Sequence, residues 1–247
     1  MKRSSAGEIT NIVPFLPYLR QDRGDRSRVP VSAKVVANLL ERSGADRIVT
    51  FDMHADQEAG FFDIPVDNLS ATRLFTDDFR GKTDFAAVAA DEGSLKKTRR
   101  LAEECGLRVA MIEKKRGPSG VDVYYVIGEE EVKDKHTVTR EDMIDTGGTA
   151  IKGDRKLVEK GARDRYLLAT HLILSPDPIT GEPAEEKLRK SGLKIVGTDS
   201  IPRSDEYIER NRDWLEVRSI SPMLAEVIFK IQKGESLTQS GMFDIPD

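Results

Sequence analysis

The stretch Thr139 to Ala150, TREDMIDTGGTA, places acidic side chains directly before a threonine- and glycine-rich turn. Acids repel anions, whereas such a turn before a helix binds them through free backbone N–H groups and the positive end of the helix dipole. The glycines also allow a ligand to come close. A ligand with both hydroxyl groups and a phosphate would satisfy both halves of the stretch. The alternative is an ordinary helix-capping turn with solvated acids.

On both sides of this stretch, short apolar runs alternate with helical segments, which is typical of an α/β fold with mainly parallel sheets. Strands are predicted at residues 9–15, 47–51, 85–90, 108–112, 165–170, 194–198 and 215–220. Helices are predicted at residues 33–42, 95–105, 150–160 and from near Pro222. The pattern repeats, so we expect two similar subdomains with a hinge near residues 68–70. The segment at 136–140, HTVTR, is a poor candidate for a buried strand.

Composition narrows the function classes. The chain has 247 residues and a net charge of −4, from 39 basic and 43 acidic residues, so no general nucleic-acid-binding surface is expected. The single cysteine, Cys105, excludes an internal disulfide and suits a reducing compartment. No apolar run reaches the roughly 20 residues of a membrane span. We therefore expect a cytoplasmic protein without membrane or nucleic-acid partners.

Further polar segments follow predicted strands, at the sheet edge where α/β folds collect ligands. Arginines around Arg20 and Gln21 suit phosphate, although a solvated loop with ion pairs would look the same. His54 and Asp91 could hold a divalent metal such as Mg²⁺ or a phosphate, although a lone histidine is more often structural. The run from Glu113 to Gly120, EKKRGPSG, could be a mobile loop that closes over a polyphosphate, or an exposed basic turn.

Four motifs in order closely resemble the ribose-phosphate pyrophosphokinase family, the phosphoribosyl-pyrophosphate synthetases. They are RQDRGDRSRVPVSAKVVANLL, FDMHADQEAGFFDIPVDNL, DMIDTGGT and SPMLAEVIFKIQKGESL. The resemblance implies two domains of the type I phosphoribosyltransferase fold. The first, residues 1–69 with the tail 230–247 packed on it, would be incomplete, because the chain starts deep within the family's first domain. The second, residues 70–229, would carry the ribose 5-phosphate loop.

The resemblance implies a transferase of nucleotide biosynthesis that moves the β,γ-diphosphate of Mg-ATP to the 1-hydroxyl of ribose 5-phosphate. The products would be phosphoribosyl diphosphate and AMP, and Mg²⁺ the cofactor. Lys114 and Arg116 would be catalytic, and His54 and Asp91 would serve the metal. The implied ATP-binding residues are Arg20, Gln21 and His54. The implied ribose 5-phosphate-binding residues are Glu141, Asp142, Asp145, Thr146, Gly147, Gly148 and Thr149.

The chain also departs from the family pattern. A Phe-x-Asp-Gly-Glu segment that a neighbouring subunit lends to the ATP site has no counterpart here, and Glu92 and Arg140 replace residues that are normally small or apolar. These departures support a rival hypothesis, a non-catalytic synthetase-like subunit with a regulatory or assembly role. A phosphoribosyltransferase would share DTGGT but has no use for RQDRGDRSR. The resemblance further implies a homo-oligomer, altered by the missing segment.

Overall fold

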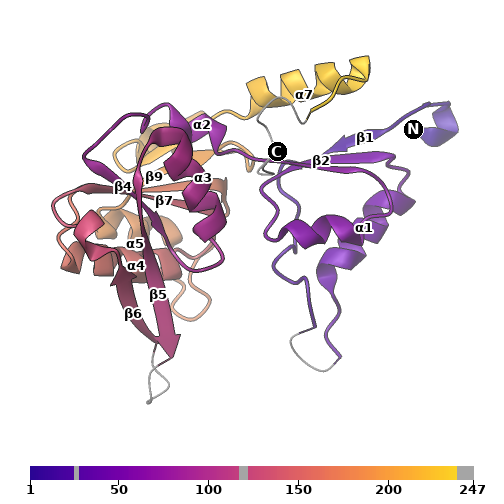
Figure 1. Cartoon of the computed structure of the whole chain (residues 1–247). Helices are drawn as coiled ribbons and strands as arrows, with labels where there is room; N and C mark the ends of the chain where they lie inside the picture. The colour runs from indigo at the N-terminus through magenta and orange to yellow at the C-terminus, as the bar shows by residue number, and fades with distance from the viewer. Residues whose placement is uncertain (25–27, 117–121, 238–247) are drawn as a thin grey trace. The chain divides into compact units, whose positions relative to one another are not determined.

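The computed structural model describes residues 1–24, 28–116 and 122–237 (Figure 1). The chain divides into two compact units. The first unit comprises Met1–Ala71 and the described end of the chain at Ser236 and Leu237, and the second comprises Thr72–Glu235. No helix in the described part of the chain is both long and apolar enough to cross a membrane.

The first unit contains a small sheet of three parallel strands in the order β1-β2-β3. Its strands are β1 (Thr10–Ile12), β2 (Arg47–Phe51) and β3 (Val66–Leu69), and its helices are η1 (Lys2–Ser4), α1 (Ser32–Arg42) and η2 (Asp56–Phe61). Helix α1 follows β1 and buries Ala33 in a cluster with Ile48 and Met53. The predicted hinge residues Asn68 and Leu69 lie in β3, and the second unit begins after Ala71.

The second unit is built on a seven-stranded sheet in the order β10-β9-β8-β7-β4-β5-β6. Every neighbouring pair in this sheet is parallel except β5 and β6, which form an antiparallel hairpin. The strands are β4 (Phe85–Ala89), β5 (Arg108–Arg116), β6 (Asp122–Ile127), β7 (His136–Ile144), β8 (Arg165–Leu172), β9 (Lys194–Thr198) and β10 (Leu215–Arg218). The α/β class with mainly parallel sheets is therefore confirmed.

Helices cover both faces of this sheet, with α2 and α3 on one side and α4 and α5 on the other (Figure 1). The helical elements are α2 (Arg73–Thr76), α3 (Leu95–Cys105), η3 (Glu129–Glu131), α4 (Gly148–Glu159), α5 (Ala184–Ser191), α6 (Asp205–Asn211) and α7 (Ser221–Lys233). Helix α3 ends where the sequence predicts, because Gly106 takes the left-handed conformation that closes a helix, and Gly234 closes α7 in the same way.

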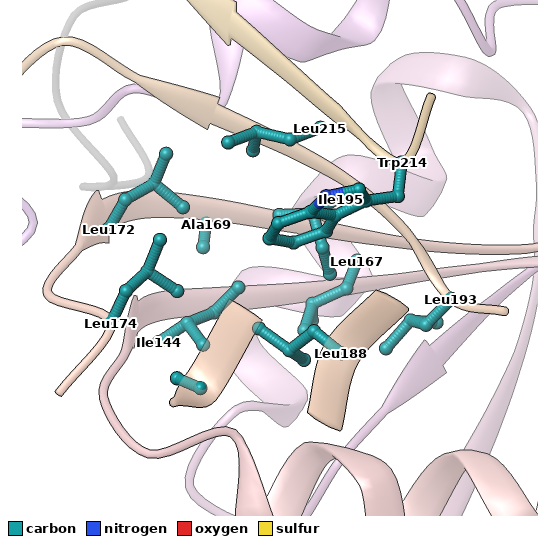
Figure 2. Packing of buried hydrophobic residues seen from close by; sticks show 11 residues of the cluster. Ile144, Leu167, Ala169, Leu172, Leu174, Leu188, Leu193, Ile195, Trp214 and Leu215 are labelled. Atoms are coloured by element: carbon teal, nitrogen blue, oxygen red, sulfur yellow. The ribbon is translucent and has the colours of Figure 1, made fainter. Parts of the chain in front are cut away.

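One apolar cluster of the second unit packs α5 against the strands β7 to β10 (Figure 2). Figure 2 shows Leu188 of α5 lying toward Ile144 and Leu167, with Ile195 on β9 and Trp214 in the turn directly before β10. Burying side chains of this size contributes about 1.5–3 kcal/mol each. This core fixes the position of α5 beneath the end of β7, where the acidic stretch begins.

Two local predictions are wrong. The polar segment 136–140 lies in β7, a strand with neighbours on both sides, because its polar side chains find partners inside the fold. His136, for example, stacks on the ring of Phe85 at 4.9 Å. Residues 113–116, predicted as part of a loop, continue β5 and pair with β6, and residues 117–121 of that prediction lie outside the described residues.

Candidate functional site

The candidate site of the second unit lies where three parallel strands end at the same edge of the sheet. Strand β4 leads to Asp91, β5 carries Lys114, and β7 leads into the loop from Asp145 to Thr149. Neighbouring parallel strands place their carboxyl ends together, and this edge is where α/β proteins bind ligands. The topology therefore gathers residues that are up to 58 positions apart, from Asp91 to Thr149, at one edge.

The turn between β7 and α4 has the backbone geometry of an anion site. Gly147 precedes α4 with φ of 72°, in the left-handed region, and no side chain caps the helix start. A Cβ on Gly147 would come within 3.1 Å of Leu188 Cδ2, so glycine is required both by its φ and by the α5 side chain beneath it. Because the first turn of a helix has no intrahelical acceptors for its N–H groups, the amides that follow Gly147 are available to an anion.

Glu141 is half-buried on β7 and lines a small cavity of about 30 Å³. The cavity is also lined by Ala90 at the end of β4 and by Thr149 in the first turn of α4. Burial, together with the nearby negative charges of Asp142 and Asp91, raises the pKa of Glu141 to about 8. The positive charges of Lys97 and Arg140 oppose this shift. Asp142 and Asp91 therefore both lie close enough to Glu141 to disfavour its charged form.

Asp91 is exposed, and its carboxylate already has a structural partner. Its Oδ1 accepts a hydrogen bond from Ser94 N at 2.8 Å, and its backbone carbonyl accepts one from Ser94 Oγ at 3.1 Å. This turn leads into α3, so Asp91 helps to begin the helix. These two contacts use Oδ1 and the backbone carbonyl, so a metal or phosphate role for the second carboxylate oxygen is compatible with them.

Lys114 lies on a strand rather than in a loop. It pairs with Tyr124 across the β5–β6 hairpin, so both side chains project from the same face. Because alternate residues of a strand share a face, Lys114 lies on the side of Ile112, which lines the cavity next to Glu141 together with Tyr124. Lys115 projects from the opposite face, where its ammonium pairs with Glu113 at 3.0 Å.

Arg116 is the last residue of β5 and pairs with Asp122 of β6 in the backbone register. Arg116 thus lies two residues beyond Lys114, at the same end of the strand. The structure describes the backbone of Arg116, and its predicted catalytic role stays a prediction.

In the first unit, Arg20 and Gln21 follow β1 and His54 follows β2, so all three come after the carboxyl ends of neighbouring parallel strands. All three side chains are exposed. The chain reaches His54 through Asp52, which is buried with φ of 36° and accepts a hydrogen bond from Ala71 N at 3.0 Å. His54 belongs to the first unit and Asp91 to the second. Within the residues described, no group of three or more His, Cys, Asp or Glu side chains is arranged to hold a metal ion.

Two residues near the candidate site were not predicted from sequence. Lys97 lies in the first turn of α3, and its positive charge lowers the pKa of Glu141. The sequence does show a lysine three residues after Ser94, where the helix starts. Because lysines are common on exposed helices, this lysine alone did not indicate a site residue. Arg140 departs from the family pattern in sequence. Its contacts could not be predicted from sequence, because Thr72 and Thr170 lie 68 and 30 residues away along the chain.

Comparison with known proteins gives a consistent result along the chain. Residues 1–44 match the model described as the N-terminal domain of ribose phosphate pyrophosphokinase, and residues 122–243 match the phosphoribosyl synthetase-associated domain.

The chain is 40% identical over 242 residues to the ribose-phosphate pyrophosphokinase of Ralstonia nicotianae, covering 96% of this chain and 73% of that protein. It is 40% identical to that of Haemophilus ducreyi, covering 99% and 76%. The crystal structure of phosphoribosylpyrophosphate synthetase from Mycobacterium smegmatis superposes with a TM-score of 0.81 and 38% identity, covering 94% of this chain and 74% of that one.

Proposed function

The chain belongs to the ribose-phosphate pyrophosphokinase family, and we propose that it transfers the diphosphate of Mg-ATP to the 1-hydroxyl of ribose 5-phosphate. The products are phosphoribosyl diphosphate and AMP. One arrangement carries the proposal for this chain: Glu141 and Asp142 lie near the end of β7, a few residues before a helix start whose amide N–H groups can donate to an anion. Carboxylates accept hydrogen bonds from sugar hydroxyls, and the helix start binds the 5-phosphate.

The ribose 5-phosphate loop is proposed to run from Asp145 to Thr149. Its amides and the hydroxyls of Thr146 and Thr149 would donate hydrogen bonds to the phosphate oxygens. Gly147 supports the loop because its left-handed φ turns the chain from β7 into α4. The dipole of α4 adds a partial positive charge at the same point.

A magnesium ion suits the charge balance of this edge. Asp142 and Asp91 both raise the pKa of Glu141, so several carboxyl groups lie near one another at this edge. Mg²⁺ prefers oxygen ligands and takes one or two carboxylates together with substrate phosphates. We propose that Asp91 of the second unit serves the metal, and that His54 of the first unit serves metal as well as ATP. When bound, the ion would neutralise charge on the diphosphate.

Positive side chains complete the proposed chemistry. Diphosphate transfer needs in-line positioning and stabilisation of negative charge more than a strong base. Lys114, which shares a sheet face with the cavity beside Glu141, and Arg116 at the end of β5 are proposed to contact the migrating group. Arg20, Gln21 and His54 of the first unit are proposed to contact ATP.

The proposed domain roles follow the same division of residues. Residues 1–69, together with the tail from 230, would form the N-terminal domain with the ATP contacts, and residues 70–229 the domain with the ribose 5-phosphate loop. A cytoplasmic location and assembly into a homo-oligomer remain further proposals.

Release of AMP is the direct test. The purified chain is incubated with ATP and Mg²⁺, with and without ribose 5-phosphate, and AMP and phosphoribosyl diphosphate are quantified by chromatography. We expect equal amounts of the two products, dependent on both the sugar phosphate and Mg²⁺. Release of ADP or phosphate independent of the sugar would contradict the proposal. Failure to bind a non-hydrolysable ATP analogue in calorimetry would instead support the non-catalytic subunit.

A further inference from the structure

Arg140 is a fully buried arginine in the middle of a sheet. Its exposed fraction is 0%, and it is among the largest side chains that the structure buries completely. It lies on β7, whose neighbours β4 and β8 cover both edges. Burying a charge is costly unless the group is hydrogen-bonded, so an arginine at this position must be held by specific contacts.

The contacts of the Arg140 guanidinium include two hydroxyl groups, a backbone carbonyl and an aromatic ring. Its Nη2 donates to Thr170 Oγ1 at 2.7 Å, and its Nη1 donates to the backbone carbonyl of Glu141. Its Nε lies 3.4 Å from Thr72 Oγ1, and the group lies over the ring of Phe75 at 5.2 Å. These contacts join β7 to β8 and to the segment that begins the second unit.

The contacts of Arg140 lie where β7 and β8 run side by side. Glu141 pairs with Ala169 and Met143 pairs with His171, so the parallel register is the same before and after this level. At this level, the guanidinium contacts the carbonyl of Glu141 on one strand and the hydroxyl of Thr170 on the other. The side chain therefore adds a side-chain bridge between β7 and β8 to the backbone ladder that already joins them.

We propose that Arg140 is a positioning residue of the ribose 5-phosphate site, which it supports through the Glu141 peptide and the β7–β8 junction. This inference rests on the proposed function of the acidic pair. Because the Glu141 carbonyl belongs to the peptide that joins Glu141 to Asp142, fixing this peptide limits the directions that both side chains can take. Loss of the bridge lets both acids shift relative to the loop that binds the phosphate.

The test compares Arg140→Met with Arg218→Met as a matched control. Each substitution removes a guanidinium group and roughly keeps the length of the side chain. Arg218 lies 5.9 Å from the same Phe75 ring, but its guanidinium donates to Leu74 O, Asp78 and Glu216. We expect Arg140→Met to weaken the binding of ribose 5-phosphate roughly tenfold or more. A tenfold loss of affinity corresponds to about 1.4 kcal/mol. Both KM and direct calorimetric binding of ribose 5-phosphate should show it. The KM for ATP should change less than about twofold by the same relation.

A role in stability alone predicts a different result. In that case both variants lower the melting temperature while each keeps the affinity for ribose 5-phosphate, and this outcome overturns the inference. If Arg140→Met does not fold, the Thr170→Val variant tests the inference instead. It removes the hydroxyl that accepts a hydrogen bond from the Arg140 guanidinium and keeps the shape of the side chain. It should weaken ribose 5-phosphate binding severalfold, and unchanged binding overturns the inference.

The inference and the proposed function fail in distinguishable ways. If the unchanged chain neither binds ribose 5-phosphate nor forms AMP, both are wrong. If the unchanged chain does both and a folded Arg140→Met protein binds the sugar phosphate equally well, only the inference is wrong.

Discussion

Lys114 and Tyr124 pair across the β5–β6 hairpin, on the face of the sheet that carries the cavity beside Glu141. The adjacent Lys115 projects from the other face, over the ring of Tyr125 at 5.7 Å. Of these two consecutive lysines, Lys114 therefore lies on the face of the candidate site and Lys115 on the opposite face. Both are exposed, so neither is required by the core.

Replacing Lys114 by alanine should abolish most of the activity and leave the fold intact. Loss of one cation that stabilises a transition state commonly costs about 10²–10³-fold in kcat. We expect Lys115→Ala to retain activity within about threefold, because its ion pair with Glu113 is a surface interaction. AMP release and thermal denaturation should be measured on both variants. Equal losses of activity in the two variants would contradict the prediction that only the lysine on the face of the candidate site takes part in the reaction.

Replacing Glu141 by glutamine should change how stability depends on pH. Folding raises the pKa of Glu141 from 4.5 to about 8, so between these values the folded state keeps a proton that the unfolded state has released. The free energy of unfolding of the wild type therefore falls as pH rises through this window, by at most about 1.4 kcal/mol per pH unit. Glutamine has no such proton.

The expected result is a stability difference between Glu141→Gln and the wild type that is small near pH 4.5 and grows in favour of the variant up to about pH 8. Chemical denaturation of the ligand-free proteins across this range measures it. A difference that stays constant with pH would mean that Glu141 is ionised in the folded protein at neutral pH.

Replacing Gly147 by alanine should destabilise the protein and weaken the proposed phosphate loop. An L-residue with φ of 72° is strained, and the new Cβ would press on Leu188 at 3.1 Å, so we expect a loss of about 1–2 kcal/mol. Gly148→Ala is the matched control, since its Cβ would have Thr146 Oγ1 as nearest neighbour at 3.7 Å, an ordinary contact. Urea denaturation should separate the two variants, and similar midpoints would contradict the geometry.

Cys105 should be almost unreactive in the folded protein. It is buried, its Sγ donates to Thr76 O at 3.5 Å, and burial raises its pKa to about 11. Because the thiolate is the reactive form, a thiol-specific reagent at pH 8 should label the native chain at least about a hundredfold more slowly than the denatured chain. The signal comes from one site, since the sequence contains a single cysteine. Rapid native labelling would show that the helix α3 opens frequently.

Much of the fold was predictable from local sequence because its signals are local. The strands at 47–51 and 194–198 are uninterrupted short runs, and they appear in the structure with the predicted bounds. Gly106 closes α3 because a left-handed residue ends a helix wherever it occurs. The order of four motifs also indicated the family, which the comparisons confirm. The site residues predicted from those motifs remain predictions, although Asp91, Lys114 and the Asp145–Thr149 loop do meet at one sheet edge.

Sequence alone determined the α/β class, the family and the turn that begins α4, because each depends on residues that are neighbours along the chain. Only the tertiary structure decided that the polar segment before this turn is an interior strand. The oxygens that hold Arg140 come from Thr72 and Thr170, 68 and 30 residues away. Only the structure decided, too, that Glu141 is half-buried beside Asp91, and hence that its pKa is raised. The energy of a buried charge depends on what surrounds it in space, and a local pattern does not contain that information.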